Sequence, residues 1–369
     1  MSALVLNSVW GLAIDWPYTA TAGASGGRLA GPFNLERPPV TALFRPANAE
    51  DISAIYKFTS KADSGLTTVP KTKQAVTEYV SESLDFLAHK PGANRLLFVA
   101  EREGKILGIS GIIPRLGVDR PFYSFKRSRH ARKASQLDLS VRYDTLQLTT
   151  DFDDYTELAT IFIDPESRGS GAGRLLSIGR LGFIHAHRDR FEKDLMADIR
   201  GWVDEDGVSP FWKHLTSRFI QTNFDEADHH SAGDAAFIVE LLPALPILMN
   251  LLPEAAANCA GKPHDLSAGA MNLLLSAGFQ DTDLCDIFDG GPAIRCRTDR
   301  TLISQTVYQA TGGGVAESEC KYLHFTGEGK NFRAAIGAAY PGAEKAGREA
   351  CDALGTITPL VALAQNRRG

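Results

Sequence analysis

The chain has 369 residues, of which 44% are apolar and 22% charged, and its formal net charge is −5 at pH 7. This is the composition of a globular protein long enough to bury one large core or two smaller ones. The modest negative charge argues against nucleic acid or an anionic membrane surface as a partner. Because the chain has no run of about eighteen apolar residues and no signal-peptide pattern, we expect no membrane span and a cytoplasmic protein.

The five cysteines are widely spaced and form no CxxC or Cys/His pattern of the kind that binds zinc. We therefore expect reduced thiols, no disulfide framework and no bound metal. A short basic cluster lies between Lys126 and Lys133. We interpret it as a solvated face, although it could also touch a phosphate-bearing cofactor.

The predicted elements begin after residues 1–38, a glycine- and proline-punctuated tail with little periodicity that we expect to be poorly ordered. Hydrophobic periodicity then predicts a strand at 41–46, a helix opened by Asp51, a helix at 72–87, and a hairpin of strands 95–101 and 106–113. The following region is less regular, and a strand is expected at 146–150.

Residues 157–164 form a continuous apolar run rich in β-branched side chains, which predicts one central buried strand. A long helix is expected from about 171 to 191. The remaining pattern predicts a strand at 235–242, a helix at 267–277 closed by Gly278, strands at 284–288 and 293–296, a loop at 312–314 and a helix at 331–339.

A glycine-rich loop lies between the buried strand and the long helix. Glycines let the backbone approach a bound group, and the N–H groups and dipole of a helix start suit an anionic pyrophosphate. Flanking arginines add charge-assisted hydrogen bonds to phosphate oxygens. The expected phosphate site is Arg168, Gly169, Ser170, Gly171, Ala172, Gly173 and Arg174.

Other uses of such a loop fit less well. A nucleoside-triphosphate loop ends in Gly-Lys-Ser/Thr, whereas this one ends in Gly-Arg-Leu. A dinucleotide fingerprint would need a glycine where Arg174 stands. The sequence also leaves open a further interpretation, in which the segment is only a glycine-rich turn between a strand and a helix. The pattern Arg-x-x-Gly-x-Gly after a buried strand resembles the acyl-CoA loop of the GNAT acyltransferase superfamily, in which that strand splays from its neighbour to admit the pantetheine arm.

Five blocks carry a narrower resemblance, to the arginine N-succinyltransferase family. They are residues 65–70, 156–165, 200–212, 261–264 and 286–292. The resemblance implies a mixed α/β (α+β) GNAT-like fold over residues 39–300, with an acceptor-site insertion at about 190–265 and a C-terminal extension at 301–369. It also implies an acyltransferase that moves succinyl from succinyl-CoA to the α-amino group of arginine.

The resemblance also assigns roles to residues. His264 falls on the family's catalytic proton donor, a role that imidazole suits near pH 7. Without the family, His264 would be interpreted as a surface or helix-capping residue. Ile161 falls on a main-chain contact to succinyl-CoA, so Ile161, Phe162 and Ile163 are expected along the donor, where their N–H groups could hold the oxyanion.

The two substrates pose opposite charge problems. The free carboxylate of succinyl-CoA calls for a cation or N–H donors, for which Arg200 and Ser209 are candidates; the guanidinium of arginine calls for carboxylates, for which Asp286 and Asp289 are candidates. A well-formed hairpin turn is the competing account of residues 286–292. The acceptor could instead be ornithine, another amine, a peptide or an antibiotic, and the chain could be an idle partner subunit. A homo-oligomer or a pair with a related chain is expected.

Overall fold

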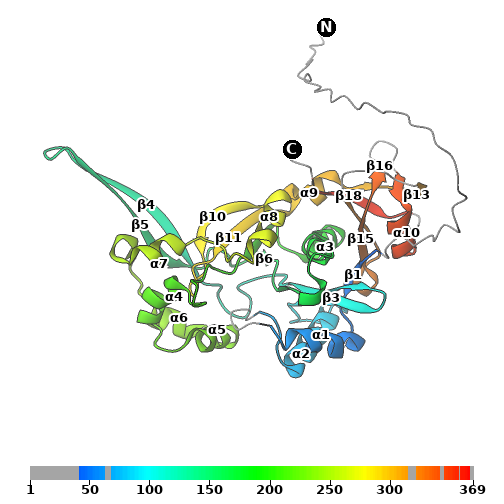
Figure 1. The fold of residues 1–369 in the computed structure, drawn as a ribbon, viewed down its shortest axis with the longest axis horizontal. Coiled ribbons are helices and arrows are strands. Elements are labelled where there is room, and N and C mark those ends of the chain that lie inside the picture. The colour runs from blue at the N-terminus through cyan, green and yellow to red at the C-terminus, as the bar shows by residue number, and fades with distance from the viewer. Residues whose placement is uncertain (1–40, 63–67, 315–320, 341–344, 357, 366–369) are drawn as a thin grey trace, which may run out of the picture. The chain divides into compact units, whose positions relative to one another are not determined.

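An eight-stranded antiparallel sheet draws its strands from both ends of the chain (Figure 1). The computed structural model describes residues 41–62, 68–314, 321–340, 345–356 and 358–365. Because β1 pairs with β15, Leu43 opposite Ala335, residues beyond 300 complete the sheet begun near the N-terminus. In sheet order the strands are β12 (Tyr308–Gln309), β18 (Leu360–Gln365), β14 (Lys321–Thr326), β15 (Arg333–Gly337), β1 (Leu43–Pro46), β2 (Leu96–Arg102), β3 (Lys105–Ile112) and β7 (Ile161–Ile163).

A second, seven-stranded sheet uses the middle of the chain. Its pairs are antiparallel except for β6 with β8, which run parallel. In sheet order the strands are β6 (Thr156–Glu157), β8 (Asp194–Asp198), β11 (Pro292–Arg297), β10 (Gln280–Cys285), β4 (Ser124–Ala134), β5 (Leu139–Thr149) and β9 (Ile247–Leu248). A small third sheet joins β13 (Thr311–Gly314), β17 (Lys345–Gly347) and β16 (Ala339–Tyr340).

Ten α-helices lie in the described residues: α1 (Ile52–Thr59), α2 (Lys73–Leu87), α3 (Ala172–Ala186), α4 (Pro210–His214), α5 (Phe224–Gly233), α6 (Ala236–Leu241), α7 (Glu254–Cys259), α8 (Ala268–Ser276), α9 (Leu302–Thr306) and α10 (Arg348–Leu354). Short 3₁₀ turns are η1 (Ala49–Asp51), η2 (Pro165–Ser167), η3 (Arg188–Arg190), η4 (Thr216–Arg218), η5 (Met249–Leu251), η6 (Thr298–Arg300) and η7 (Gly329–Asn331). No helix in these ranges is long and apolar enough to cross a lipid bilayer.

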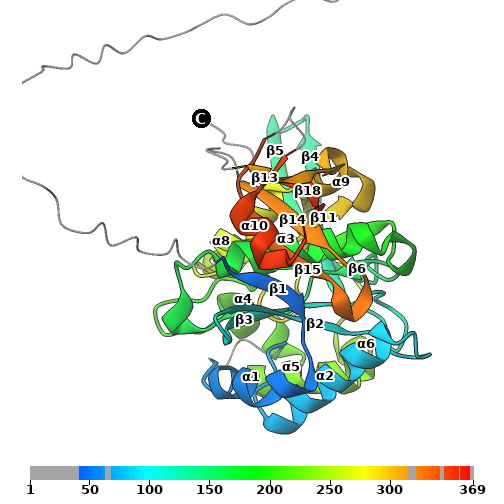
Figure 2. The same cartoon turned by 90° about the vertical axis from the view of Figure 1, so that its right-hand side faces the viewer.

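Helices cover both faces of the first sheet around β2 and β3. Helices α1 and α2 lie on one side and α3 on the other (Figure 1, Figure 2). Strand β2 shows the alternation that this requires. Leu97 and Val99 pack with α1 and α2, whereas Leu96 and Phe98 join the core around α3, where the Phe98 and Phe183 rings are 4.9 Å apart. The two-sided burial explains why the first five residues of this strand are all apolar.

The early elements and the helix before Gly278 are confirmed. The structure has β1, α1, α2 and the β2–β3 hairpin where periodicity placed them. The Thr72 hydroxyl caps α2 by accepting a 3.0 Å hydrogen bond from the Ala75 N–H. Helix α8 ends before Gly278, whose φ of +108° suits a residue without Cβ. The tail 1–38, by contrast, lies outside the described residues.

Several other predictions are wrong. Residues 235–242 contain α6 and not a strand, because the buried residues Ala235, Ile238 and Leu242 recur at helical spacing, while Val239 and Leu241 are exposed. Residues 331–339 contain β15 and not a helix, because pairing with β1 and β14 overrides the helix propensity of its alanines. The loop expected at 312–314 belongs to β13, and α3 ends at Ala186, short of residue 191.

The less regular region after residue 113 contains a long hairpin. Strands β4 and β5 pair without interruption from Ser124 opposite Thr149 to Ala134 opposite Leu139, and Figure 1 shows the hairpin extending beyond the rest of its sheet. Its outer half is exposed on both strands, and it includes the basic cluster at 126–133. Because neither face there packs on a core, the sequence lacks the alternation that marks a strand.

The strand predicted at 157–164 is broken, and its two halves enter different sheets. Strand β6 pairs with β8, whereas β7 pairs with β3. Between them Thr160 has a φ of +38°, a strained value for a β-branched residue. The Arg180 guanidinium, 2% exposed, stabilises the break by donating to the carbonyls of Ala159 (2.9 Å) and Gly111 (3.3 Å). The break leaves β7 at the edge of the first sheet.

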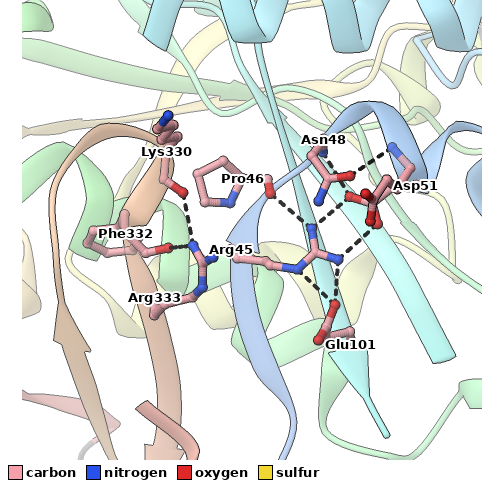
Figure 3. A network of polar contacts seen from close by, with 9 residues as sticks. Arg45, Pro46, Asn48, Asp51, Glu101, Lys330, Phe332 and Arg333 are labelled. Atoms are coloured by element: carbon pink, nitrogen blue, oxygen red, sulfur yellow. Dashed lines mark hydrogen bonds and ion pairs between the residues drawn. The ribbon is translucent and has the colours of Figure 1, made fainter. Parts of the chain in front are cut away.

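An ion-pair network fixes the end of β1 (Figure 3). The Arg45 guanidinium donates to both carboxylate oxygens of Asp51, at 2.7 and 2.8 Å, and its Nε donates to Glu101 at 2.8 Å. The Asp51 carboxylate also accepts from the Asn48 N–H at 2.8 Å, which completes a capping box at η1. Arg45 thus joins β1, η1 and β2.

Replacing Arg45 with Met is expected to destabilise the protein by about 2–4 kcal/mol, because it leaves the nearly buried Asp51 carboxylate without its cation. Urea unfolding should record the loss. Arg129→Met is the matched control, since its pair with Asp144 is exposed, and it should cost under about 1 kcal/mol. Equal losses in the two variants would contradict a special role for Arg45.

Candidate functional site

The glycine-rich loop leaves room and donors for an anion at the start of α3. Gly169 and Gly171 have φ values of +79° and +86°, and a Cβ added at either would meet nothing within 4 Å. Their N–H groups donate to no acceptor within the described part of the chain. Glycine is therefore required by the backbone conformation, and the space above the loop is open. Fifteen-residue α3 directs its positive dipole end to the same place.

Two arginines flank this loop. Arg168 is exposed and Arg174 half-buried, and neither forms an ion pair with a described residue. A third arginine, Arg102, stabilises the loop itself by donating a hydrogen bond to the Ser170 carbonyl at 3.1 Å. Open N–H groups and uncommitted guanidinium groups are what a pyrophosphate requires.

A cavity of about 330 Å³ lies beside the broken strand. Its walls come from the break itself (157–161), from the end of β8 (197–200), from the turn at 286–289 and from α5, α6 and α8. Of the predicted site residues, Ile161, Arg200, Asp286 and Asp289 line it. Ser209, His264 and residues 162–174 do not. The insertion therefore contributes to the wall through α5 and α6.

The cavity is acidic. Five of its lining residues are acids and three are arginines: Glu157, Asp198, Asp228, Asp286, Asp289, and Arg120, Arg180, Arg200. Burial raises the pKa of Glu157 to about 7, against the opposing effect of Arg120 and Arg180. Burial, and then the charge of Asp289, raises the pKa of Asp286 to about 8. The pKa of Asp198 also lies well above its usual range, through burial and repulsion from Asp286 and Asp289.

The turn at 286–289 holds its carboxylates rigidly. Asp286 Oδ1 accepts from the N–H groups of Phe288 and Asp289, both at 2.7 Å. The two Asp289 oxygens accept from Gly201 (2.7 Å) and Gly291 (2.8 Å). The alternative prediction, a well-formed turn in this segment, is therefore correct. It is compatible with binding, because the same side chains face the cavity.

Ser209 has a local role. Its hydroxyl caps α4 by accepting from the Trp212 N–H at 3.3 Å and donates to the Asp289 carbonyl at 3.2 Å. It supports the turn and does not line the cavity. Contact between Ser209 and a substrate therefore stays a prediction without geometric support.

His264 lies just before α8, partly exposed. Its Nδ1 accepts from the Leu266 N–H at 3.1 Å, and its carbonyl accepts from Ser267 at 2.8 Å. Its own N–H donates to the Arg200 carbonyl at 2.8 Å, which ties it to a cavity-lining residue. In a neutral ring this arrangement places the proton on Nε2. The geometry fits the capping interpretation, and proton donation to a substrate stays a prediction.

Sequence reasoning missed five of the eight charged residues that line the cavity: Glu157, Arg180, Asp198, Arg120 and Asp228. Glu157 is 7% exposed and its carboxylate makes no hydrogen bond to the described residues, Arg180 is buried in α3, and Asp198 ends β8. A signal existed for the first two, because an acid in an apolar strand and an arginine in the middle of an apolar helix are rarely buried without a partner. No group of three metal-ligating side chains occurs among the described residues.

The mixed α/β fold, with the glycine loop at the start of α3, is that of a GNAT-like acyltransferase. More narrowly, the chain belongs to the arginine N-succinyltransferase family: the model "Arginine N-succinyltransferase beta subunit" matches residues 42–303. The chain is 35% identical over 263 residues to the arginine N-succinyltransferase of Citrobacter koseri, covering 70% of this chain and 76% of that protein. An Escherichia coli enzyme of that name is 34% identical over the same shares.

A solved structure agrees over a longer stretch. The arginine/ornithine succinyltransferase subunit AI from Pseudomonas aeruginosa matches with a TM-score of 0.75 and 25% identity, covering 89% of this chain and 100% of that one. The resemblance to the arginine N-succinyltransferase family and the predicted fold class are therefore confirmed. The division into domains and the roles of single residues stay predictions.

Proposed function

We propose that the protein transfers the succinyl group of succinyl-CoA to the α-amino group of arginine. The observation that carries this is the position of an acidic, partly apolar cavity at the break between β6 and β7, on the strand that leads into the glycine loop. A donor held by the loop and an acceptor held by the cavity would meet at that break. The names of the relatives supply the acceptor and the succinyl group, and the glycine-rich loop supports coenzyme A as the carrier of that group.

The donor half uses the backbone. The pyrophosphate of coenzyme A would accept hydrogen bonds from the N–H groups at 169 and 171, with Arg168 and Arg174 adding charge. From there the pantetheine arm would follow the unpaired edge of β7, past Ile163 and Phe162, to place the thioester near Ile161. Arg200, a cation on the cavity wall, is suited to the free carboxylate of the succinyl group.

The acceptor half needs a base. An α-amine is protonated near pH 7 and cannot attack a thioester until it loses its proton. Glu157 lies at the break and has a pKa raised to about 7, which suits a general base. The freed amine would attack the thioester carbonyl, and the resulting oxyanion would accept hydrogen bonds from backbone N–H groups of β7. Collapse expels the thiolate of coenzyme A, which takes a proton from His264, the proposed donor. The attacking nitrogen loses a second proton as the amide forms, and that proton restores His264.

A thiol-release assay tests this function. Purified protein with succinyl-CoA should release free coenzyme A in the presence of arginine, and mass spectrometry should find the product 100 mass units heavier, roughly a succinyl group less one hydrogen. Acetyl-CoA in place of succinyl-CoA and ornithine in place of arginine define donor and acceptor preference. Absence of thiol release with every amine offered, in protein that binds succinyl-CoA, would refute the proposal.

Gly171→Ala tests the loop separately. A side chain at φ +86° costs about 1–2 kcal/mol of local strain, so the loop should shift and the KM for succinyl-CoA should rise about tenfold, with the KM for arginine unchanged. Gly92→Ala is the matched control, because Gly92 has φ +81° and equally open surroundings but lies far from the loop in the chain, in the turn after α2. A rise of the same size in both variants would indicate general strain and no donor contact.

A further inference from the structure

Asp198 is the acid in the cavity least compensated by the protein. It is the last residue of β8, its Oδ1 is buried, and that oxygen accepts no hydrogen bond from the described chain. No ion pair links Asp198, Asp286 or Asp289 to any lysine or arginine in the described ranges. Removing a carboxylate from water without a partner is costly, so a cation from outside the chain would stabilise this group.

The neighbouring aspartates are fixed in place by the backbone. A Cβ at Gly201 would lie 2.5 Å from the Asp289 carbonyl, and one at Gly291 would lie 2.0 Å from the Ile199 carbonyl, so these segments meet too closely for any side chain. The N–H groups of both glycines donate to Asp289. Asp286 and Asp289 are therefore held without help from any side-chain cation, as a preorganised binding site requires.

The cluster lies at a defined distance from Glu157. In the parallel β6–β8 pair Glu157 is opposite Met196, and Asp198 is two residues further along on the same face. Two residues along a strand span about 7 Å and neighbouring strands are about 4.8 Å apart, so the backbones of Glu157 and Asp198 are about 8 Å apart on the diagonal. This is the scale of the separation between an α-amino group and the charged end of a three-carbon side chain. Glu157 is itself nearly buried, its carboxylate makes no hydrogen bond to a described residue, and it lines the same cavity.

We propose that Asp198, together with the Asp286–Asp289 turn, binds the positively charged end of the acceptor's side chain while Glu157 faces its α-amino group. The inference rests on the proposed function, since it concerns the acceptor of that reaction. The protein then selects acceptors by side-chain charge at a set distance from the amine. A neutral side chain of the same length and shape can donate a hydrogen bond to Asp198 but supplies no positive charge to the buried carboxylates, and it is rejected for that reason.

Arginine and citrulline separate charge from shape, because citrulline has a neutral urea where arginine has a guanidinium. In the wild-type protein kcat/KM for arginine should exceed that for citrulline by at least about 100-fold. Asp198→Asn should lower kcat/KM for arginine about 10- to 100-fold, mainly through KM, and leave citrulline unchanged or improved. Asp225→Asn removes an exposed acid on α5 and serves as the control for net charge.

The outcomes distinguish failure of the inference from failure of the function. If Asp198→Asn lowers arginine and citrulline turnover by the same factor, the side-chain site is wrong while succinyl transfer stands. If the wild-type protein turns over no amine, calorimetric titration of arginine and citrulline into the wild type and Asp198→Asn still tests the site. Equal affinities there would overturn it. Circular dichroism and thermal unfolding identify a misfolded variant, and Asp198→Glu, which keeps the charge, should then retain preference for arginine.

Discussion

Replacing Glu157 with Gln is expected to lower kcat for arginine about 10²- to 10⁴-fold, the range usual for loss of a general base. Glutamine keeps the shape of the side chain and cannot accept a proton from the substrate ammonium. Because the pKa of Glu157 is raised to about 7, wild-type activity should rise about tenfold per pH unit below 7 and level off above it. In the variant this limb of the pH profile should disappear.

The same substitution should stabilise the protein by an amount that depends on pH. The pKa of Glu157 is about 7 in the folded state against 4.5 unfolded, so the carboxyl ionises more easily in the unfolded chain. The contribution of this carboxyl group to the free energy of unfolding of the wild-type protein is fully present below pH 4.5 and falls as the pH rises to about 7. Glu157→Gln should therefore match the wild type at pH 4 and exceed it by about 1–3 kcal/mol at pH 8.

Urea unfolding at the two pH values measures the difference. Glu103→Gln is a suitable control, because Glu103 lies in the exposed turn between β2 and β3 and should change neither kcat nor stability appreciably. A Glu157→Gln variant that loses stability at pH 8 would mean that the carboxylate is ionised and paired in the folded protein. A variant that keeps the wild-type kcat would show that Glu157 is not the general base. The expected gain in stability would identify Glu157 as a residue kept at a cost for function.

The loop could be predicted from the sequence because its chemistry is local. The glycines, the flanking arginines and the start of α3 lie within a dozen residues of one another, and their backbone conformations depend on residue type more than on distant contacts. The same holds for the capped helix α2 and the β2–β3 hairpin. Where the determinants are consecutive, pattern and structure agree.

The cavity could not be predicted, because it depends on a change of sheet in the middle of one apolar run. Nothing between Glu157 and Ile163 marks the break locally; it is stabilised by Arg180 from α3 and by the Gly111 backbone of β3. Missing the break meant that Glu157 was counted as part of a buried strand and that Asp198 was not considered. Asp286 and Asp289 were identified, since a family block contained them, but their rigid geometry depends on Gly201, far away in sequence.

Replacing His264 with Ala and with Asn should separate capping from proton transfer. Asparagine can accept the Leu266 N–H with its side-chain oxygen, as Nδ1 does at 3.1 Å, so the start of α8 should be preserved. Alanine cannot accept this hydrogen bond, and losing the cap should lower the free energy of unfolding by about 0.5–2 kcal/mol. Neither residue can protonate a thiolate. If His264 is the proton donor, both variants should lose at least about 100-fold in kcat with little change in the KM for arginine.

A capping role alone gives a different result. His264→Asn would then retain nearly all activity, and His264→Ala would lose only what its lower stability explains. The leaving group supplies a further measurement, because an acyl donor whose thiol has a low pKa needs less help in departing. Such a donor should restore much of the lost rate in His264→Asn if the missing step is protonation of the thiolate. It should restore nothing in Glu157→Gln, where the missing step is deprotonation of the amine.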